Sequence, residues 1–156
     1  MREFLSIKKG KLERIQRASS PRKFMKYTLG KIRRAFGHKL IGNSNMERVV
    51  CETLLIFPDE IIDHITKNCW FVGSFEEGTA FTLRGDELKR NEYLIYLSDQ
   101  LFVQSKKDMR YTIAHEIGHA VLGHKNSILE SQTKQEIRRQ EKQAHDFALK
   151  HLNQDS

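Results

Sequence analysis

Residues 105–123 read SKKDMRYTIAHEIGHAVLG, and they contain the motif His-Glu-Ile-Gly-His at positions 115–119. Two histidines four residues apart lie one above the other on one face of an α-helix. That spacing lets both imidazoles bind one zinc ion, while the glutamate between them moves protons. The motif therefore predicts a metal site, provided that the segment is helical.

The flanking residues predict that the segment is a helix. Ser105 is a typical N-cap, and Asp108 completes a capping box three residues later, so the first turn begins at Lys106. Gly123 follows the last apolar residues, where a C-cap glycine is expected. At about 100° per residue, His115 and His119 lie opposite an apolar arc, with Glu116 at the margin between the two faces. The arc consists of Met109, Ile113, Ile117, Ala120 and Val121.

The composition is that of a globular protein. The chain has 156 residues, of which 38% are hydrophobic and 30% charged, enough for one domain with a modest core. No apolar run approaches the ~18 residues that a transmembrane helix needs, and residues 1–10 lack the apolar region of a signal peptide. Cys51 and Cys69 lie in apolar stretches and read as reduced core thiols, so we expect a cytoplasmic protein.

The positive charge is concentrated at the front of the chain. Residues 1–45 contain 13 Lys and Arg against 2 Asp and Glu, a net charge of +11. Because the whole chain has a net charge of +7, residues 46–156 carry a net charge of −4. We therefore expect a basic helical extension over residues 1–45 and one folded domain over residues 46–156. The extension has four readings: binding to nucleic acid phosphates, to an acidic membrane surface or to an acidic partner, or packing against the domain.

The pattern between residues 46 and 98 predicts helix first and then strands. Apolar residues recur at helical spacing over residues 46–67, with a break at Pro58, which begins a second helical piece. Three short strands follow at residues 69–72, 79–83 and 93–97. Three strands in a row are most simply an antiparallel sheet, so the fold class is α+β: a small antiparallel sheet of about three strands, the motif helix and a last helix over residues 134–152.

A catalytic zinc needs a third protein ligand and one position open for water. Glu141 lies in the middle of the apolar stripe of the last helix, where a carboxylate without a counter-charge is costly and a divalent cation removes that cost. His145 shares the stripe, either as an alternative ligand or as a partner that holds Glu141. His124 follows His119 by five residues, which is out of register for a third histidine ligand. We favour Glu141.

Two motifs resemble the ImmA/IrrE family of zinc metallopeptidases. Residues 110–119, RYTIAHEIGH, are similar to the family core, and residues 141–148, EKQAHDFA, are similar to its second motif. The resemblance covers about residues 46–152 and implies a zincin-like fold, with Glu141 as the third zinc ligand. It also implies a site-specific endopeptidase of bacteria or their mobile elements, acting on a regulatory protein such as a transcriptional repressor. The chain departs from the family in having His145 where Asn or Asp is usual.

The predicted mechanism uses these residues together. His115, His119 and Glu141 hold Zn²⁺, and Glu116 accepts a proton from water and passes it to the leaving amine. Tyr111 and His124 are candidate donors to the transition state. The strand at residues 93–97 is expected to align an extended protein substrate at the edge of the sheet.

Two other functions are compatible with the same residues. The first is a non-catalytic regulatory protein in which His115, His119, Glu141 and His145 form a closed structural zinc site. The second is a nucleic-acid binder that carries an inactive peptidase fold, with residues 1–45 as the binding arm.

Overall fold

The structure is a computed structural model that describes residues 26–74, 80–84, 92–124 and 131–154. The first 25 residues of the predicted basic helical extension lie outside the described residues. The first described helix is α2, Leu29–Phe36, and Thr28 caps it by accepting a hydrogen bond from the backbone N–H of Lys31.

Helix α2 and the short strand β1, Leu40–Ile41, contribute to the core of the protein. Ile32 and Phe36 are at most 1% exposed. Arg33 forms an ion pair of 2.8 Å with Glu47 of the following helix. Residues 29–41 therefore share the hydrophobic core of the rest of the chain, although the charge pattern groups them with the basic extension.

Two helices occupy the stretch that the sequence predicted as one helix with a break at Pro58. Helix α3 spans Ser44–Leu54, and the Asn43 side chain caps it by accepting a hydrogen bond of 2.9 Å from the Met46 N–H. Helix α4 spans Asp59–Asn68 and begins directly after Pro58. Proline is tolerated at a helix start because a backbone N–H there would have no hydrogen-bond partner within the helix.

The three predicted strands are present, as β2, Cys69–Ser74, β3, Ala80–Arg84, and β4, Tyr93–Ser98. The α+β class is confirmed, but the prediction that the sheet is antiparallel is wrong for most of its pairings. The four strands have the order β1-β2-β4-β3; β2 runs parallel to both β1 and β4, and β3 pairs antiparallel with β4. Sequence patterns give the strands but not their order, because the order depends on contacts between distant residues.

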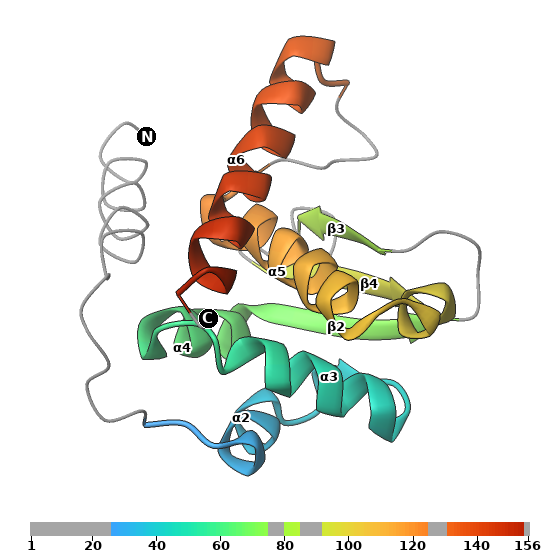
Figure 1. Cartoon of the computed structure of the whole chain (residues 1–156), viewed down its shortest axis with the longest axis vertical. Coiled ribbons are helices and arrows are strands. Elements are labelled where there is room, and N and C mark those ends of the chain that lie inside the picture. The colour runs from blue at the N-terminus through green and yellow to red at the C-terminus, as the bar shows by residue number, and fades with distance from the viewer. Residues whose placement is uncertain (1–25, 75–79, 85–91, 125–130, 155–156) are drawn as a thin grey trace.

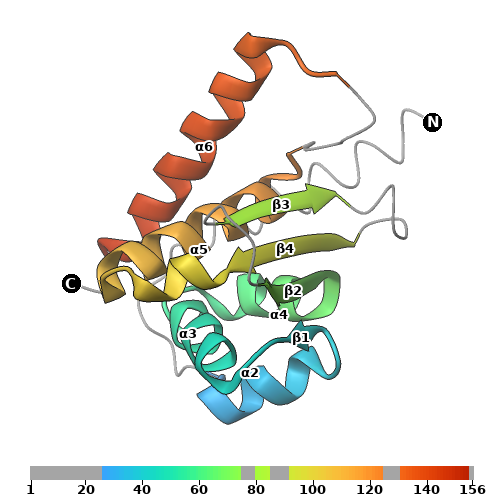
Figure 2. The same ribbon diagram turned by 90° about the vertical axis from the view of Figure 1, so that its right-hand side faces the viewer.

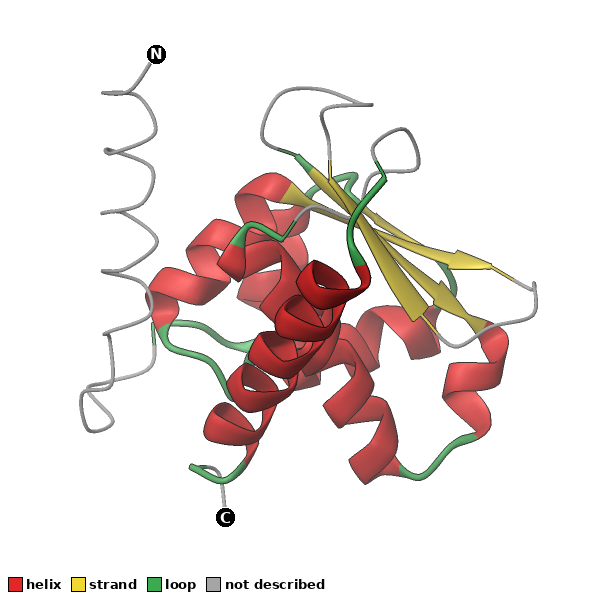
Figure 3. Ribbon diagram, turned by 90° about the horizontal axis from the view of Figure 1, so that it is seen from above, coloured by secondary structure: helices red, strands yellow, loops and turns green. Residues whose placement is uncertain are grey.

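One face of the sheet packs against the helices. In β4, Tyr93, Ile95 and Leu97 are buried, whereas Leu94 and Tyr96 on the opposite face are half-buried. The same alternation occurs in β2, where Cys69 and Phe71 are fully buried. Figure 3 shows the helices gathered on one side of the sheet, so the core lies between the sheet and the helices.

The motif helix is α5, Lys106–Leu122, which has the predicted bounds and lies across the sheet (Figure 1). Ser105 accepts a hydrogen bond from the Asp108 N–H, but it donates its own proton to the Asp108 carboxylate at 2.6 Å instead of completing the predicted capping box. Gly123 ends the helix with a left-handed backbone, φ 69°. The predicted apolar arc is buried except for Met109, which is half-buried.

The last helix is α6, Lys134–Leu152, which also has the predicted bounds. A capping box of Thr133 and Glu136 begins it. Its C-terminal half packs beside α5, whereas its N-terminal half extends beyond the body of the molecule (Figures 1 and 2). None of the helices in the described part of the chain combines the length and the apolar character that a membrane crossing requires.

Candidate metal centre

Three of the predicted ligands converge where α5 and α6 cross. The Nε2 atom of His115 lies 3.2 Å from Glu141 Oε2, and the Nε2 atom of His119 lies 3.4 Å from Glu141 Oε1. The two Nε2 atoms are 3.1 Å apart. One ligand atom from each of these residues lies within 4.8 Å of the other two, so the three side chains could hold a single ion.

The close approach of the two helices depends on small residues. A Cβ atom at Gly118 would lie 3.0 Å from Phe147 Cδ1 and 3.3 Å from the Ala144 Cα, which is tighter than ordinary contact. Ala144 and Ala148 are fully buried in the same interface. Because Gly118 has no side chain, α6 lies close enough to α5 for the Glu141 carboxylate to reach the two histidines.

Glu141 differs from the prediction in one respect. The sequence placed it in the middle of a buried apolar stripe, but its side chain is 53% exposed. Ile137, one turn earlier on the same stripe, is 44% exposed. The reason is that the N-terminal half of α6 extends past the body, so the stripe is covered only from Ala144 onward.

Glu116 is held by a residue that sequence reasoning missed. Its side chain is buried, and the Thr82 hydroxyl from β3 donates a hydrogen bond of 2.5 Å to its Oε2 atom. Burial raises the pKa of Glu116 to about 7, and the hydrogen bond from Thr82 opposes that shift. In the sequence, Thr82 is the polar residue between Phe81 and Leu83, a signal too common to identify its role.

His124 lies against His119, although it is out of register for a helix. The two Nδ1 atoms are 3.0 Å apart, and His124 Nε2 lies 3.1 Å from the Gln143 side-chain oxygen. The left-handed backbone of Gly123 reverses the chain, and the His124 N–H donates a hydrogen bond of 3.0 Å to the His119 carbonyl. Burial lowers the pKa of His119 to about 3 and also lowers the pKa of His124, so both rings are neutral near pH 7.

His145 and Tyr111 lie one helical turn away from the three ligands. The Tyr111 hydroxyl is 2.7 Å from His145 Nδ1, and the Tyr111 ring is 5.9 Å from the His115 ring, measured between centroids. His145 is exposed and its ring faces Tyr111, and it is not one of the three converging ligands. His145 therefore contacts Tyr111 through Nδ1, whereas the sequence suggested that it would hold Glu141.

The donor set fits a divalent metal such as zinc. Two imidazole nitrogens and a carboxylate oxygen are the ligands that catalytic zinc sites use, with a fourth position left for water or substrate. His119 is neutral, as a metal ligand must be, because burial and the neighbouring His115 and His124 rings lower its pKa. The same residues can therefore hold a cation and keep a proton acceptor, Glu116, beside it on α5.

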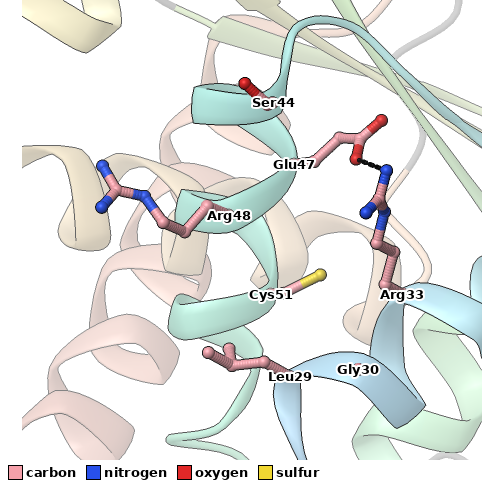
Figure 4. A pocket seen from close by; sticks show the side chains of 7 residues that line it. All are labelled: Leu29, Gly30, Arg33, Ser44, Glu47, Arg48 and Cys51. Carbon is pink, nitrogen blue, oxygen red and sulfur yellow. Dashed lines mark ion pairs between the residues drawn. The ribbon is translucent and has the colours of Figure 1, made fainter.

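A separate cavity of about 270 Å³ lies between α2 and α3, away from α5 and α6 (Figure 4). The Arg33–Glu47 ion pair spans it. Cys51 lies in its lining, and burial raises the pKa of this thiol to about 11, so it is not a reactive thiolate near pH 7.

Comparison with known protein families supports a peptidase. Residues 85–156, which carry the H-E-x-x-H motif, Glu141 and Gln143, match the model of the family described as peptidase U49. No curated protein and no solved structure matches the chain. The family match supports a proteolytic function in general, whereas the likeness to ImmA/IrrE peptidases rests on the two sequence motifs alone.

Proposed function

We propose that this protein is a zinc-dependent endopeptidase with its active site at the crossing of α5 and α6. The observation that carries the proposal is the convergence of His115, His119 and Glu141, whose ligand atoms lie within 4.8 Å of one another. The match of residues 85–156 to a peptidase family supports proteolysis independently of that geometry.

Each residue of the site has a distinct role in this proposal. A zinc ion held by His115, His119 and Glu141 would supply Lewis-acid activation of water and of the scissile carbonyl. Glu116 takes the proton from the attacking water and passes it to the leaving amine. Thr82 fixes the orientation of the Glu116 carboxylate. The Tyr111 hydroxyl, one turn before His115, is the candidate donor to the oxyanion.

The proposed path of the substrate follows β3. The sequence suggested that residues 93–97 align an extended substrate, but this is wrong because β4 is paired on both sides, with β2 and with β3. In the sheet of described residues, β3 is the edge strand next to β4, and its Thr82 contacts Glu116. An extended peptide added to β3 would run past the ligands of α5.

The substrate class comes from the two motifs that resemble ImmA/IrrE peptidases. On that basis we propose a regulatory protein, such as a transcriptional repressor, as the substrate. The basic residues 1–45 would then help to bind an acidic partner or nucleic acid, although residues 1–25 lie outside the described structure. The two buried free thiols, Cys51 and Cys69, suit the cytoplasm.

The geometry favours catalysis over a purely structural zinc site. A structural site is closed by four protein ligands, and the sequence offered His145 as the fourth. The His145 ring instead bonds Tyr111. Among the described residues, the group that converges on a cation position has three members, which is the number in a catalytic site.

The test combines metal analysis with substitution of the proposed base. Wild-type protein is expected to contain zinc and to cleave members of a peptide library, with products read by mass spectrometry. Glu116→Gln is expected to keep its zinc and to lose roughly 100- to 10,000-fold in cleavage rate. Glu60→Gln, an exposed position on α4, serves as the matched control and is expected to behave as wild type.

Two results would contradict the proposal. One is a Glu116→Gln protein with bound zinc and full cleavage activity. The other is a wild-type protein whose activity survives removal of zinc by a chelator.

A further inference from the structure

A continuous line of hydrogen-bonding groups leads from α6 into the metal site. It begins at the side-chain oxygen of Gln143, which is 3.1 Å from His124 Nε2. It continues through the 3.0 Å contact between the Nδ1 atoms of His124 and His119. It ends at His119 Nε2, which faces His115 and Glu141.

The first contact fixes where the proton of His124 lies. An amide oxygen accepts hydrogen bonds and has no proton to donate, so the proton between Gln143 and His124 belongs to His124 Nε2. A neutral imidazole carries one N–H only. His124 Nδ1 is therefore a bare acceptor.

The second contact then fixes the proton of His119. Two ring nitrogens 3.0 Å apart form a hydrogen bond only if one of them carries a proton. Since His124 Nδ1 is bare, the proton lies on His119 Nδ1. His119 Nε2 is consequently unprotonated, and its lone pair points at His115 and Glu141.

We propose that Gln143 and His124 are positioning residues that hold His119 in the Nδ1–H tautomer, so that its Nε2 lone pair is available to a divalent cation. This inference rests on the proposed function, because it concerns the same metal site. It adds two residues that neither the sequence motifs nor the family match assigns. Neither residue touches the cation position; both act through His119.

The fold builds this line from two elements that already form the site. Gly123 turns the chain at the end of α5 so that His124 lies back against His119, with the His124 N–H bonded to the His119 carbonyl. His124 is 8% exposed and His119 2% exposed, and the contact between their two Nδ1 atoms is buried. Gln143 comes from α6, two residues after Glu141, so α6 supplies both a ligand and the group that orients another ligand.

Three substitutions at one position separate this role from simple packing. Gln143→Glu keeps an acceptor, Gln143→Lys offers only a donor, and Gln143→Met offers neither, at similar side-chain length. The direct measurement is the tautomer of His119 in metal-free protein, read from nitrogen-15 shifts of the ring near pH 7. Zinc affinity, measured by competition with a chromophoric chelator, is the second measurement.

The expected results differ in direction between the variants. Wild type and Gln143→Glu show His119 as the Nδ1–H tautomer, and Gln143→Glu binds zinc at least as tightly as wild type. Gln143→Lys shifts His119 toward the Nε2–H tautomer, and Gln143→Met gives a mixture of the two. Both of these variants lose roughly 10- to 100-fold in zinc affinity, the usual effect of removing a group that orients a metal ligand.

The outcomes distinguish this inference from the peptidase proposal. An Nε2–H tautomer of His119 in wild type, or a Gln143→Met protein with unchanged tautomer and unchanged zinc affinity, would overturn the role of Gln143. A wild-type protein that has the expected tautomer but binds no zinc would overturn the proposed function, while the hydrogen-bond line itself would stand.

Discussion

Glu116, the proposed proton acceptor, has a pKa that burial and one hydrogen bond shift in opposite directions. Burial raises the pKa of its carboxyl group to about 7, because the charged form is poorly solvated. The Thr82 hydroxyl donates to Oε2 at 2.5 Å and stabilises the charged form. A base with a pKa near the working pH is both sufficiently ionised and sufficiently basic to move protons. In the proposed mechanism Thr82 therefore tunes the base although it bears no charge.

Thr82→Val tests this balance, since valine keeps the shape of threonine without the hydroxyl. The lost hydrogen bond raises the pKa of Glu116, so the carboxylate is protonated up to a higher pH. A hydrogen bond to a charged group contributes about 1.5–3 kcal/mol, which predicts a loss of roughly 7- to 80-fold in kcat/KM near pH 7. The acid side of the pH profile of kcat/KM is expected to move to higher pH.

The matched control is Thr82→Ser, which retains the hydroxyl and is expected to keep the wild-type profile. A Thr82→Val enzyme with an unshifted profile would show that the hydrogen bond does not set the basicity of Glu116.

At the scale of the elements, the helix pair α5 and α6 forms the site, and Gly118 sets the distance between them. The Cβ of an alanine at this position would lie 3.3 Å from the Ala144 backbone, which cannot yield as a flexible side chain can. Gly118→Ala is expected to destabilise the metal-free protein by about 1–3 kcal/mol through overpacking, despite the better helix propensity of alanine. Because α6 is displaced, the zinc affinity is expected to fall as well.

Gly30→Ala is the matched control for that change. Gly30 also lies in a helix, α2, but a Cβ there would meet only the end of the Arg34 side chain, at 3.7 Å. This control is expected to gain up to about 1 kcal/mol from helix propensity and to leave zinc affinity unchanged. Urea unfolding and chelator competition measure both quantities. A Gly118→Ala protein that is as stable as Gly30→Ala would show that the helices do not depend on close approach here.

The elements themselves were largely predictable from local signals. The bounds of α5 and α6 follow from Ser105, Gly123 and Thr133, because caps are short-range features of the chain. The position of β4 between β2 and β3 was not predictable, because periodicity says which residues form a strand and not which strands pair. The short strand β1 was also missed, since two residues carry no periodic pattern.

The site was predictable only where its residues follow helical spacing. His115, His119 and Glu141 were identified from motifs, and the structure brings them together. His124 is out of register for a third histidine ligand, but the left-handed turn at Gly123 places it against His119. Thr82 and Gln143 reach the site from β3 and α6 through tertiary contacts, which no local pattern encodes.

At the scale of the whole molecule, the end of α6 packs the helix pair α5 and α6 against the rest of the core. Phe147 stacks on Phe57, which follows α3, at 5.7 Å between ring centroids. His151 lies against both rings, 4.9 Å from Phe57 and 4.7 Å from Phe147, and is 4% exposed. Its Nδ1 atom is buried and makes no hydrogen bond to any part of the chain that the structure describes. Because an apolar environment disfavours the charged form of a histidine ring, the stability of the fold depends on pH through His151.

Burial, assisted by the charge of Lys150, lowers the pKa of His151 to about 4, against about 6.5 in the unfolded chain. The unfolded chain therefore binds the proton more tightly than the folded protein does. The neutral His151 ring makes its full contribution to the free energy of unfolding above about pH 6.5, and this contribution is lost as the pH falls toward 4. Between pH 7 and pH 4.5 this predicts a loss of roughly 2 kcal/mol in the free energy of unfolding.

His151→Leu removes this titration and keeps an apolar side chain between the two phenylalanines. Urea unfolding of wild type and variant near pH 7 and near pH 4.5, with a chelator present to keep both metal-free, gives two differences in stability. The free energy of unfolding of the variant relative to wild type is expected to be about 2 kcal/mol higher at the lower pH than at the higher pH. All other titrating groups are shared, so their effects cancel in this comparison. Equal differences at the two pH values would mean that His151 takes up its proton as easily in the folded protein as in the unfolded chain.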